Sequence, residues 1–149
     1  MAYTVSQGPN TNDRHYIAAA MRAPMLERDY EASLGRRWRD TQDEKALGEL
    51  VTSHIRLVVK IASGFRGYGL AVSDLIQEGN IGLLEAAKRF DPERDIRFST
   101  YASWWILASV QEFIIRNASI IRLGSTPAQK RLFFNLRRLR SKIADNLGG

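Results

Sequence analysis

Apolar residues recur along the chain at the three- and four-residue spacing of amphipathic helices, and Pro and Gly stand at the breaks. The sequence has no sustained alternation of apolar and polar residues and no repeat of fixed period. The pattern therefore predicts an all-α fold, a compact bundle with short loops and an extended basic C-terminal helix. The expected helices cover about 12–22, 26–39, 41–65, 73–89, 99–117 and 126–145.

Capping residues and helix breakers set these boundaries. Ser73 or Asp74 is expected to cap the helix over 73–89, and Ser99 the helix over 99–117. Thr126-Pro127-Ala128-Gln129 has the pattern of a capping box with Pro at the first helical position. Residues 1–11 are polar and turn-rich, which predicts a flexible arm.

Several helices have one apolar side that predicts their contribution to the core. The stripe on 26–39 consists of Tyr30, Leu34 and Trp38, and His54 lies on the apolar side of 41–65 as a semi-buried core residue. The apolar side of 73–89 consists of Leu75, Ile76, Leu83, Ala86, Ala87 and Phe90. Ile81 falls on the opposite, polar side, where a single exposed isoleucine is normal. Among acids and amides it is also compatible with a small docking surface for a basic helix.

The helix over 99–117 is apolar on more than one face. The core face is expected to hold Ala102, Ile106, Val110, Phe113 and Ile114, while a second face gathers Phe98, Tyr101 and Trp105, with Trp104 beside them. A helix that is apolar all round is usually buried all round. Here Arg97, Arg116 and Arg122 flank the rings, and aromatic rings interleaved with cations are suited to holding unstacked bases. We therefore favour a platform for single-stranded nucleic acid over a core role.

Composition narrows the class of function further. The chain has 149 residues, no Cys and two distant histidines, which excludes a disulfide scaffold, thiolate metal sites and cysteine nucleophiles. It has no paired carboxylates, nucleophile constellation or Gly-rich phosphate loop beyond the weak cluster GFRGYG at 64–69. No apolar run reaches the length of a membrane span, and no signal pattern is present. We expect a cytoplasmic protein that is not an enzyme and takes no metal or cofactor.

The net positive charge of the protein is concentrated in the last third of the chain. The net charge is +6, and residues 97–149 hold nine basic and two acidic residues. A one-sided basic surface attracts polyanions, so nucleic acid is the first partner to consider. A solvated arginine-rich face kept for solubility is the alternative.

Two adjacent segments resemble a known family. DLIQEGNIGLLEAAKRFDP (74–92) followed by RFSTYASWW (97–105) resembles the most characteristic segment of bacterial sigma factors of the sigma-70 family. Residues 16–38 and 50–70 resemble the preceding helices of that family, and QKRLFFNLRRLR (129–140) resembles a box of its heat-shock, sigma-32-like subgroup. The resemblance implies a sigma domain 2 bundle over 12–122 and the start of the next region over 123–149. We expect the chain to correspond to the N-terminal and central part of the family, without its C-terminal helix-turn-helix domain.

The resemblance also implies roles for individual residues. Contacts to a coiled coil of the largest subunit of core RNA polymerase fall on Asp74, Gln77, Glu78, Asn80, Ile81 and Leu84. Opening and holding the non-template strand of the −10 promoter element falls on Phe98, Thr100, Tyr101, Trp104 and Trp105. Ala108 and Gln111 occupy positions that read the upstream edge of that element, Arg116 and Arg122 are expected to contact phosphates, and Arg97 belongs to the same DNA-binding set. The subgroup box, which bears on polymerase binding and on turnover by chaperone and protease regulators, holds Gln129, Lys130, Arg131, Phe133, Phe134, Arg137 and Arg138.

These roles together describe a transcription initiation factor that acts without catalysis and directs the transcription of bacterial stress (heat-shock) genes. Such a factor is expected in the bacterial cytoplasm, associated with the nucleoid. Two positions depart from the family, since Leu107 replaces a usual Lys or Arg and Ala118 a usual Trp of the subgroup. The alternative is a helical interaction module that binds polymerase or a regulator and no DNA.

Overall fold

The computed structural model describes residues 25–117 together with His15, Ala18, Arg138 and Asp145. Within this part the chain forms helices and no strand: α2 (Arg28–Thr41), α3 (Glu44–Thr52), α4 (Ile55–Ser63), α5 (Val72–Arg89) and α6 (Phe98–Arg116). The prediction of an all-α bundle is confirmed. The expected arm, the expected helices over 12–22 and 126–145 and the capping box lie outside the described residues, apart from those four isolated positions.

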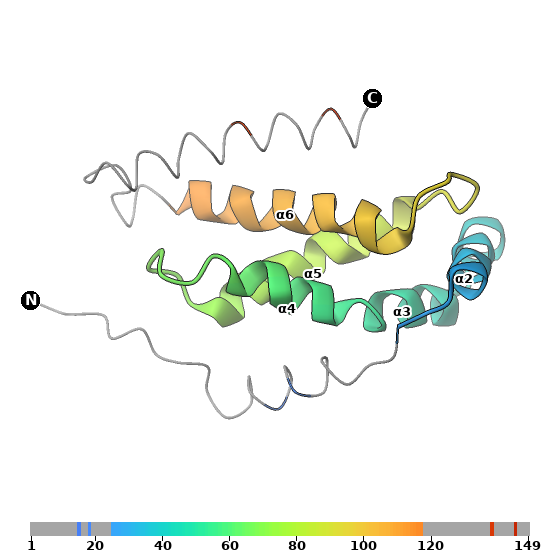
Figure 1. Ribbon diagram of the computed structural model, residues 1–149, viewed down its shortest axis with the longest axis horizontal. Coiled ribbons are helices and arrows are strands. Elements are labelled where there is room, and N and C mark those ends of the chain that lie inside the picture. Colours follow the sequence, from blue (N-terminus) through green and yellow to red (C-terminus); the bar gives the residue numbers. More distant parts are fainter. Residues whose placement is uncertain (1–14, 16–17, 19–24, 118–137, 139–144, 146–149) are drawn as a thin grey trace, which may run out of the picture.

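The helices α5 and α6 form the most extensive helix pair of the described part, and α4 packs against both. In Figure 1 the orange α6 lies along α5, and α2 lies at the same end of the bundle as the yellow segment that joins α5 to α6. Glycines permit the close approach of the central helices. A Cβ atom on Gly82 would lie 2.5 Å from the Trp105 carbonyl oxygen, and one on Gly79 would lie 2.7 Å from Val58 Cγ1.

The apolar side of α5 faces the core as its periodicity predicts. All six predicted residues are buried, and Leu75, Leu83 and Ala86 are completely inaccessible. On the opposite side 56% of Ile81 is exposed, together with 38% of Leu84. A helix of ordinary amphipathic pattern thus retains two large apolar side chains on its outer face.

The expected helix over 41–65 is wrong as a single element, because the chain breaks at Ser53 and His54 into α3 and α4. Side chains of three successive residues approach carbonyl oxygens four residues earlier. Thr52 Oγ1 donates to Gly48 O and Ser53 Oγ to Glu49 O, both at 2.7 Å, and His54 Nδ1 lies 2.7 Å from Leu50 O. Such bonds to the preceding turn bend helices. His54 itself is 9% exposed, which confirms its core position.

The expected caps of the two long helices are also wrong. The N-cap of α5 is Ala71, and no side chain caps it, so Ser73 and Asp74 lie inside the helix. The N-cap of α6 is Arg97 rather than Ser99, and the Phe98 amide donates to Glu31 Oε2 of α2 at 3.1 Å. Local sequence cannot predict this arrangement, because the acceptor belongs to a helix 67 residues away.

Two of the three residues of the predicted apolar stripe of α2 are confirmed, since Leu34 is buried and Trp38 packs against the core, but the prediction is wrong for Tyr30. Tyr30 is 42% exposed and donates to Glu49 Oε1 at 2.6 Å, whereas the adjacent Glu31 is 2% exposed. The buried side of α2 therefore contains Glu31, Leu34 and Gly35. The carboxylate of Glu31 is tolerated there because other helices supply its partners, as described below.

Candidate nucleic-acid interface

Three of the four rings near the start of α6 reach the surface. Tyr101, Trp104 and Trp105 are partly exposed, and Thr100 on the same helix is exposed. The bundle leaves this part of α6 uncovered enough for its rings to meet a ligand. The prediction that these side chains are accessible is confirmed for the tyrosine and the two tryptophans.

Two residues expected to contact DNA are buried, and these expectations are corrected. Phe98 is completely inaccessible, with its ring edge-on to His54 at 4.7 Å and to Phe90 at 5.1 Å between centroids. Gln111 is also completely inaccessible, and neither of its side-chain amide atoms has a hydrogen-bond partner among the described residues. Phe98 therefore belongs to the core, where its ring packs against His54 at the start of α4 and Phe90 at the end of α5. In this conformation neither side chain reads a base.

A cavity of about 440 Å³ opens between the start of α6 and the segment that precedes it. We call it the aromatic cavity. Its lining consists of Arg89, Phe90, Asp91, Arg94, Ile96, Tyr101 and Trp105. Its volume lies within the range of about 300–1,000 Å³ typical of ligand pockets. The residues from α6 are the aromatic Tyr101 and Trp105, and those from 89–96 combine charged side chains with Phe90 and Ile96.

The rings of the aromatic cavity are held by their neighbours. Tyr101 lies 5.9 Å from Phe90 and 6.4 Å from Trp105 between ring centroids. The guanidinium of Arg89 stands 5.1 Å from the centroid of Trp105, within the range of a cation–π contact. The cavity thus joins flat apolar surfaces to a cation, the combination that single-strand binders use for bases and phosphates.

The predicted cations differ in how they are engaged. Arg97 Nε donates to Glu31 Oε2 at 3.0 Å and its Nη2 to Leu26 O at 2.9 Å, so this arginine serves the fold. Arg116 is exposed and forms a 3.7 Å ion pair with Glu78 of α5. Ala108 and Leu107 are partly buried on α6. Arg122 lies outside the described residues, as does the subgroup box apart from Arg138, which is helical and exposed.

A buried carboxylate organises the helix junction beneath the rings. Glu31 accepts from Arg97 and from the Phe98 amide, and its Oε1 lies 3.6 Å from His54 Nε2. Burial by itself raises the pKa of Glu31, but the hydrogen bonds from His54, Arg97 and Phe98 outweigh it and hold the pKa below the carboxyl's ordinary value. The two ring nitrogens of His54 lie near oxygen atoms of different elements, Nδ1 2.7 Å from Leu50 O and Nε2 3.6 Å from Glu31 Oε1.

A second, smaller cavity of about 210 Å³ lies beside the N-terminal end of α6. Its lining consists of Met25, Leu26, Ser53, His54, Arg56, Leu57, Lys60, Arg97 and Ser99. The cavity therefore combines apolar side chains with several cations. Both cavities adjoin the first turns of α6.

The outer face of α5 carries the residues expected to bind polymerase. Asp74 and Gln77 are exposed, and Glu78 and Asn80 are half-buried beside the exposed pair Ile81 and Leu84. Ile81 and Leu84 are two of the four large hydrophobic residues that are exposed in the described part of the chain. The geometry gives a small apolar patch rimmed by acids and amides, which fits a docking surface.

Sequence reasoning missed the wall of the aromatic cavity formed by Arg89, Phe90, Asp91, Arg94 and Ile96. The sequence signal in this region is the charged run DPERD over 91–95, whose Pro and Asp residues favour a turn but indicate no cavity. Across residues 25–117 and the four isolated described positions, no cluster of three or more His, Cys, Asp or Glu side chains is arranged to hold a metal. In the same part of the chain, no helix has both the length and the apolar character to cross a membrane.

The chain is similar in sequence to bacterial RNA polymerase sigma factors. Residues 50–120 match the family described as sigma-70 region 2. The chain is 54% identical over 136 residues to the RNA polymerase sigma factor RpoH of Zymomonas mobilis, covering 91% of this chain and 45% of that protein. It is 50% identical over 136 residues to RpoH of Caulobacter vibrioides (91% and 46%), and 46% identical over 128 residues to the RNA polymerase sigma-C factor of Myxococcus xanthus (86% and 43%). The chain spans a little under half the length of these relatives.

Proposed function

The chain belongs to the sigma-70 family of sigma factors, and from this premise we propose that it is a transcription initiation factor of the heat-shock subgroup. It binds core RNA polymerase through α5 and recognises and opens the −10 promoter element through α6. It acts without catalysis, because binding energy drives the opening of the duplex.

The aromatic cavity is the observation that carries this proposal. A base that leaves the duplex loses stacking worth a few kcal/mol. It regains about 1–3 kcal/mol for each ring on which it stacks, here Tyr101 or Trp105. Arg89 and Arg94 at the rim can neutralise the phosphates on either side of the flipped base. The second cavity offers a further place for a base along the same strand.

The docking surface of α5 supports the polymerase half of the proposal. Ile81 and Leu84 supply the apolar centre, and Asp74, Gln77 and Glu78 supply a rim for basic partners. A helix of the coiled coil of the largest polymerase subunit is the partner that this face fits. Regulation by chaperones and proteases through the subgroup box, and action at the nucleoid, extend the same proposal to the rest of the chain.

The experiment is a reconstitution of the chain with core RNA polymerase. Gln77→Lys combined with Glu78→Lys is expected to weaken co-purification with the polymerase without lowering Tm, whereas Glu44→Lys on α3 leaves both unchanged. The complex is expected to bind a single-stranded non-template −10 oligonucleotide in preference to a scrambled strand. The affinity is expected to fall with rising salt. The logarithm of the binding constant changes with the logarithm of the salt concentration with a slope of about −0.7 for each phosphate neutralised.

The second candidate is an interaction module that binds polymerase or a regulator but no DNA. The burial of Phe98 and Gln111 favours it, because two of the residues expected to meet bases are inaccessible. Association with polymerase combined with equal affinity for −10 and scrambled strands would establish this second function in place of the first.

A further inference from the structure

The helix α2 braces the aromatic cavity without contributing to its lining. All lining residues come from 89–96 and from α6. The segment over 90–97, which joins α5 to α6, has no regular secondary structure. A wall built from such a segment keeps its shape only if contacts from elsewhere hold it, and these contacts come from α2.

Apolar packing supplies the first of these contacts. Gly35 of α2 comes so close to the segment that a Cβ atom on it would lie 3.1 Å from Phe90 Cδ1 and 3.2 Å from Pro92 Cβ. Trp38 Nε1 donates to the Lys88 carbonyl at the end of α5, at 3.3 Å. This part of the 90–97 segment is therefore pressed directly against α2.

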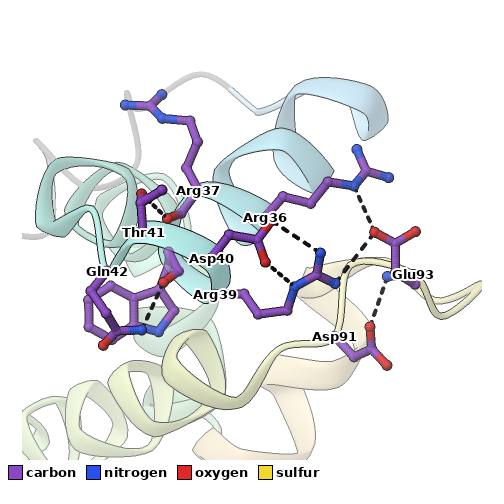
Figure 2. Close-up of polar contacts among 9 residues, drawn as sticks. Arg36, Arg37, Arg39, Asp40, Thr41, Gln42, Asp91 and Glu93 are labelled. Carbon is purple, nitrogen blue, oxygen red and sulfur yellow. Dashed lines mark hydrogen bonds and ion pairs between the residues drawn. The ribbon is translucent and has the colours of Figure 1, made fainter.

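Ion pairs supply the second set of contacts. Arg36 Nε lies 2.8 Å from Glu93 Oε1, and Arg39 Nη1 lies 3.5 Å from the same oxygen, as Figure 2 shows. Arg28 at the start of α2 pairs with Asp95. Two arginines one turn apart thus converge on one carboxylate, and a third holds the residue two positions later.

Glu93 lies between two residues of the cavity wall in the sequence, Asp91 and Arg94. The Glu93 amide donates to Asp91 Oδ1 at 3.0 Å, and the Arg94 amide donates to Asp91 O at 3.3 Å. Glu93 therefore lies in the turn between the lining residues Asp91 and Arg94. A displacement of Glu93 relative to α2 would displace both of them.

We infer that Arg36 and Arg39 are positioning residues, which act through Glu93 to hold the wall of the aromatic cavity in the shape that receives a base. The inference rests on the proposed function, since it assigns a role in base binding. A pre-shaped wall raises affinity because the ordering is already present before the base arrives. The arginines do not contact the nucleic acid in this account.

The first test measures the free protein by amide hydrogen exchange. Arg36→Glu is expected to speed exchange of the Arg94 and Ile96 amides by about two- to fivefold, the range of an exposed ion pair. Arg37→Glu is the matched control, because Arg37 is a neighbouring exposed arginine whose partner is Asp43, 2.6 Å away, and not the 90–97 segment. Equal exchange in the two variants would overturn the inference.

The second test measures the complex of the full chain with core RNA polymerase, using a fluorescent non-template −10 strand. Arg36→Glu is expected to weaken binding about two- to fivefold more than Arg37→Glu, although the two variants change the net charge equally. The exchange of charges in Arg36→Glu with Glu93→Arg keeps the net charge of the wild type and is expected to restore most of the affinity. A purely electrostatic effect on DNA would not be rescued in this way.

A scan of the strand with single abasic positions connects the effect to the cavity. At the position whose base fills the cavity, the difference between Arg36→Glu and Arg37→Glu is expected to disappear. A difference that persists at every abasic position, or a charge exchange that restores nothing, would overturn the positioning role. If the wild-type complex shows no preference for the −10 strand, the proposed function fails, and the role in base binding fails with it. The hydrogen-exchange measurement would still show whether Arg36 holds the 90–97 segment in place.

Discussion

At the scale of single residues, Trp105 is a partly exposed ring that lines the aromatic cavity beside the guanidinium of Arg89. We expect Trp105→Ala to weaken binding of the −10 non-template strand to the polymerase complex by about 1–3 kcal/mol, the worth of one stacked base. Fluorescence anisotropy at fixed salt measures the change.

The matched control for this substitution is Tyr30→Ala, which removes an exposed ring from α2. Tyr30 does not line the aromatic cavity, so its removal should leave DNA affinity unchanged. Equal affinity losses in the two variants would show that the contribution of Trp105 is not local to the cavity.

Glu31 gives a prediction about stability rather than binding. We expect Glu31→Gln to lower the free energy of unfolding by about 1.5–3 kcal/mol at neutral pH, since the charged hydrogen bonds from Arg97 and from the Phe98 amide are weakened. Urea denaturation followed by circular dichroism measures this difference.

The pH dependence of that difference has a definite sign. The folded state holds the pKa of Glu31 below the ordinary value of 4.5, so its stabilising contribution is complete above that value. The contribution is lost as the pH falls through the lower pKa of the folded state. Wild type and Glu31→Gln should therefore converge in acid, and a difference that stays constant down to pH 3 would contradict this role.

At the scale of elements, periodicity predicts the buried side of α5 and the aliphatic core face of α6, where Ala102, Ile106, Val110 and Ile114 are inaccessible, but it does not predict which rings of α6 are covered. One side of α5 is apolar and the other polar, so the buried side follows from the pattern, and Ile81 is recognisable as an exception. In contrast, α6 is apolar on more than one face, and its pattern cannot decide which rings are covered. Phe98 is buried and Trp105 is partly exposed because of where α2 and the 90–97 segment lie, which no local pattern contains.

The aromatic cavity and the Glu31 cluster were not predictable for a related reason. The cluster around Glu31 joins residues far apart in the sequence, such as Glu31 and Arg97. The lining of the aromatic cavity is close in sequence, but its shape depends on the 90–97 segment, which has no regular secondary structure and is held by distant contacts such as Arg36 with Glu93. The resemblance to the sigma-70 family identified Tyr101 and Trp105, because their positions in the motif carry a role. It did not identify Arg89 or Arg94, whose contribution depends on the shape of a turn.

The close packing of α5 on α6 gives a prediction for the helix pair. Because a Cβ atom on Gly82 would lie 2.5 Å from the Trp105 carbonyl oxygen and 2.7 Å from Ser109 Oγ, Gly82→Ala forces the helices apart. We expect a loss of about 1–3 kcal/mol of stability, measured as a lower midpoint of urea denaturation.

A glycine in another helix provides the contrast. A Cβ atom on Gly48 of α3 would meet no atom within 4 Å, so Gly48→Ala should gain up to about 1 kcal/mol from helix propensity. Opposite signs for the two substitutions would show that close packing, and not helix propensity, keeps glycine at position 82. Destabilisation by both would contradict this explanation.

At the scale of the whole molecule, the proposed polymerase and DNA surfaces lie on adjacent helices and are joined by an ion pair. Glu78 belongs to the docking surface of α5, and Arg116, 3.7 Å away on α6, is an expected phosphate contact. An exposed pair of this kind contributes about 0.2–1 kcal/mol, so either partner can be drawn away by a stronger ligand. Engagement of Glu78 by the polymerase would leave Arg116 available to the DNA strand.

This arrangement predicts opposite effects of one substitution on the two partners. Glu78→Gln should weaken association with core polymerase, because a charged rim contact is lost, and strengthen binding of single-stranded −10 DNA to the isolated chain about two- to fivefold, because Arg116 is released. Glu44→Gln, an equal charge change on α3, corrects for the general effect of net charge on DNA affinity. Combining Glu78→Gln with Arg116→Ala should abolish the gain in DNA affinity. It should also reduce the salt dependence of DNA binding by the amount that corresponds to about one phosphate contact. If the gain persists in the double variant, it does not pass through Arg116, and the two surfaces act independently.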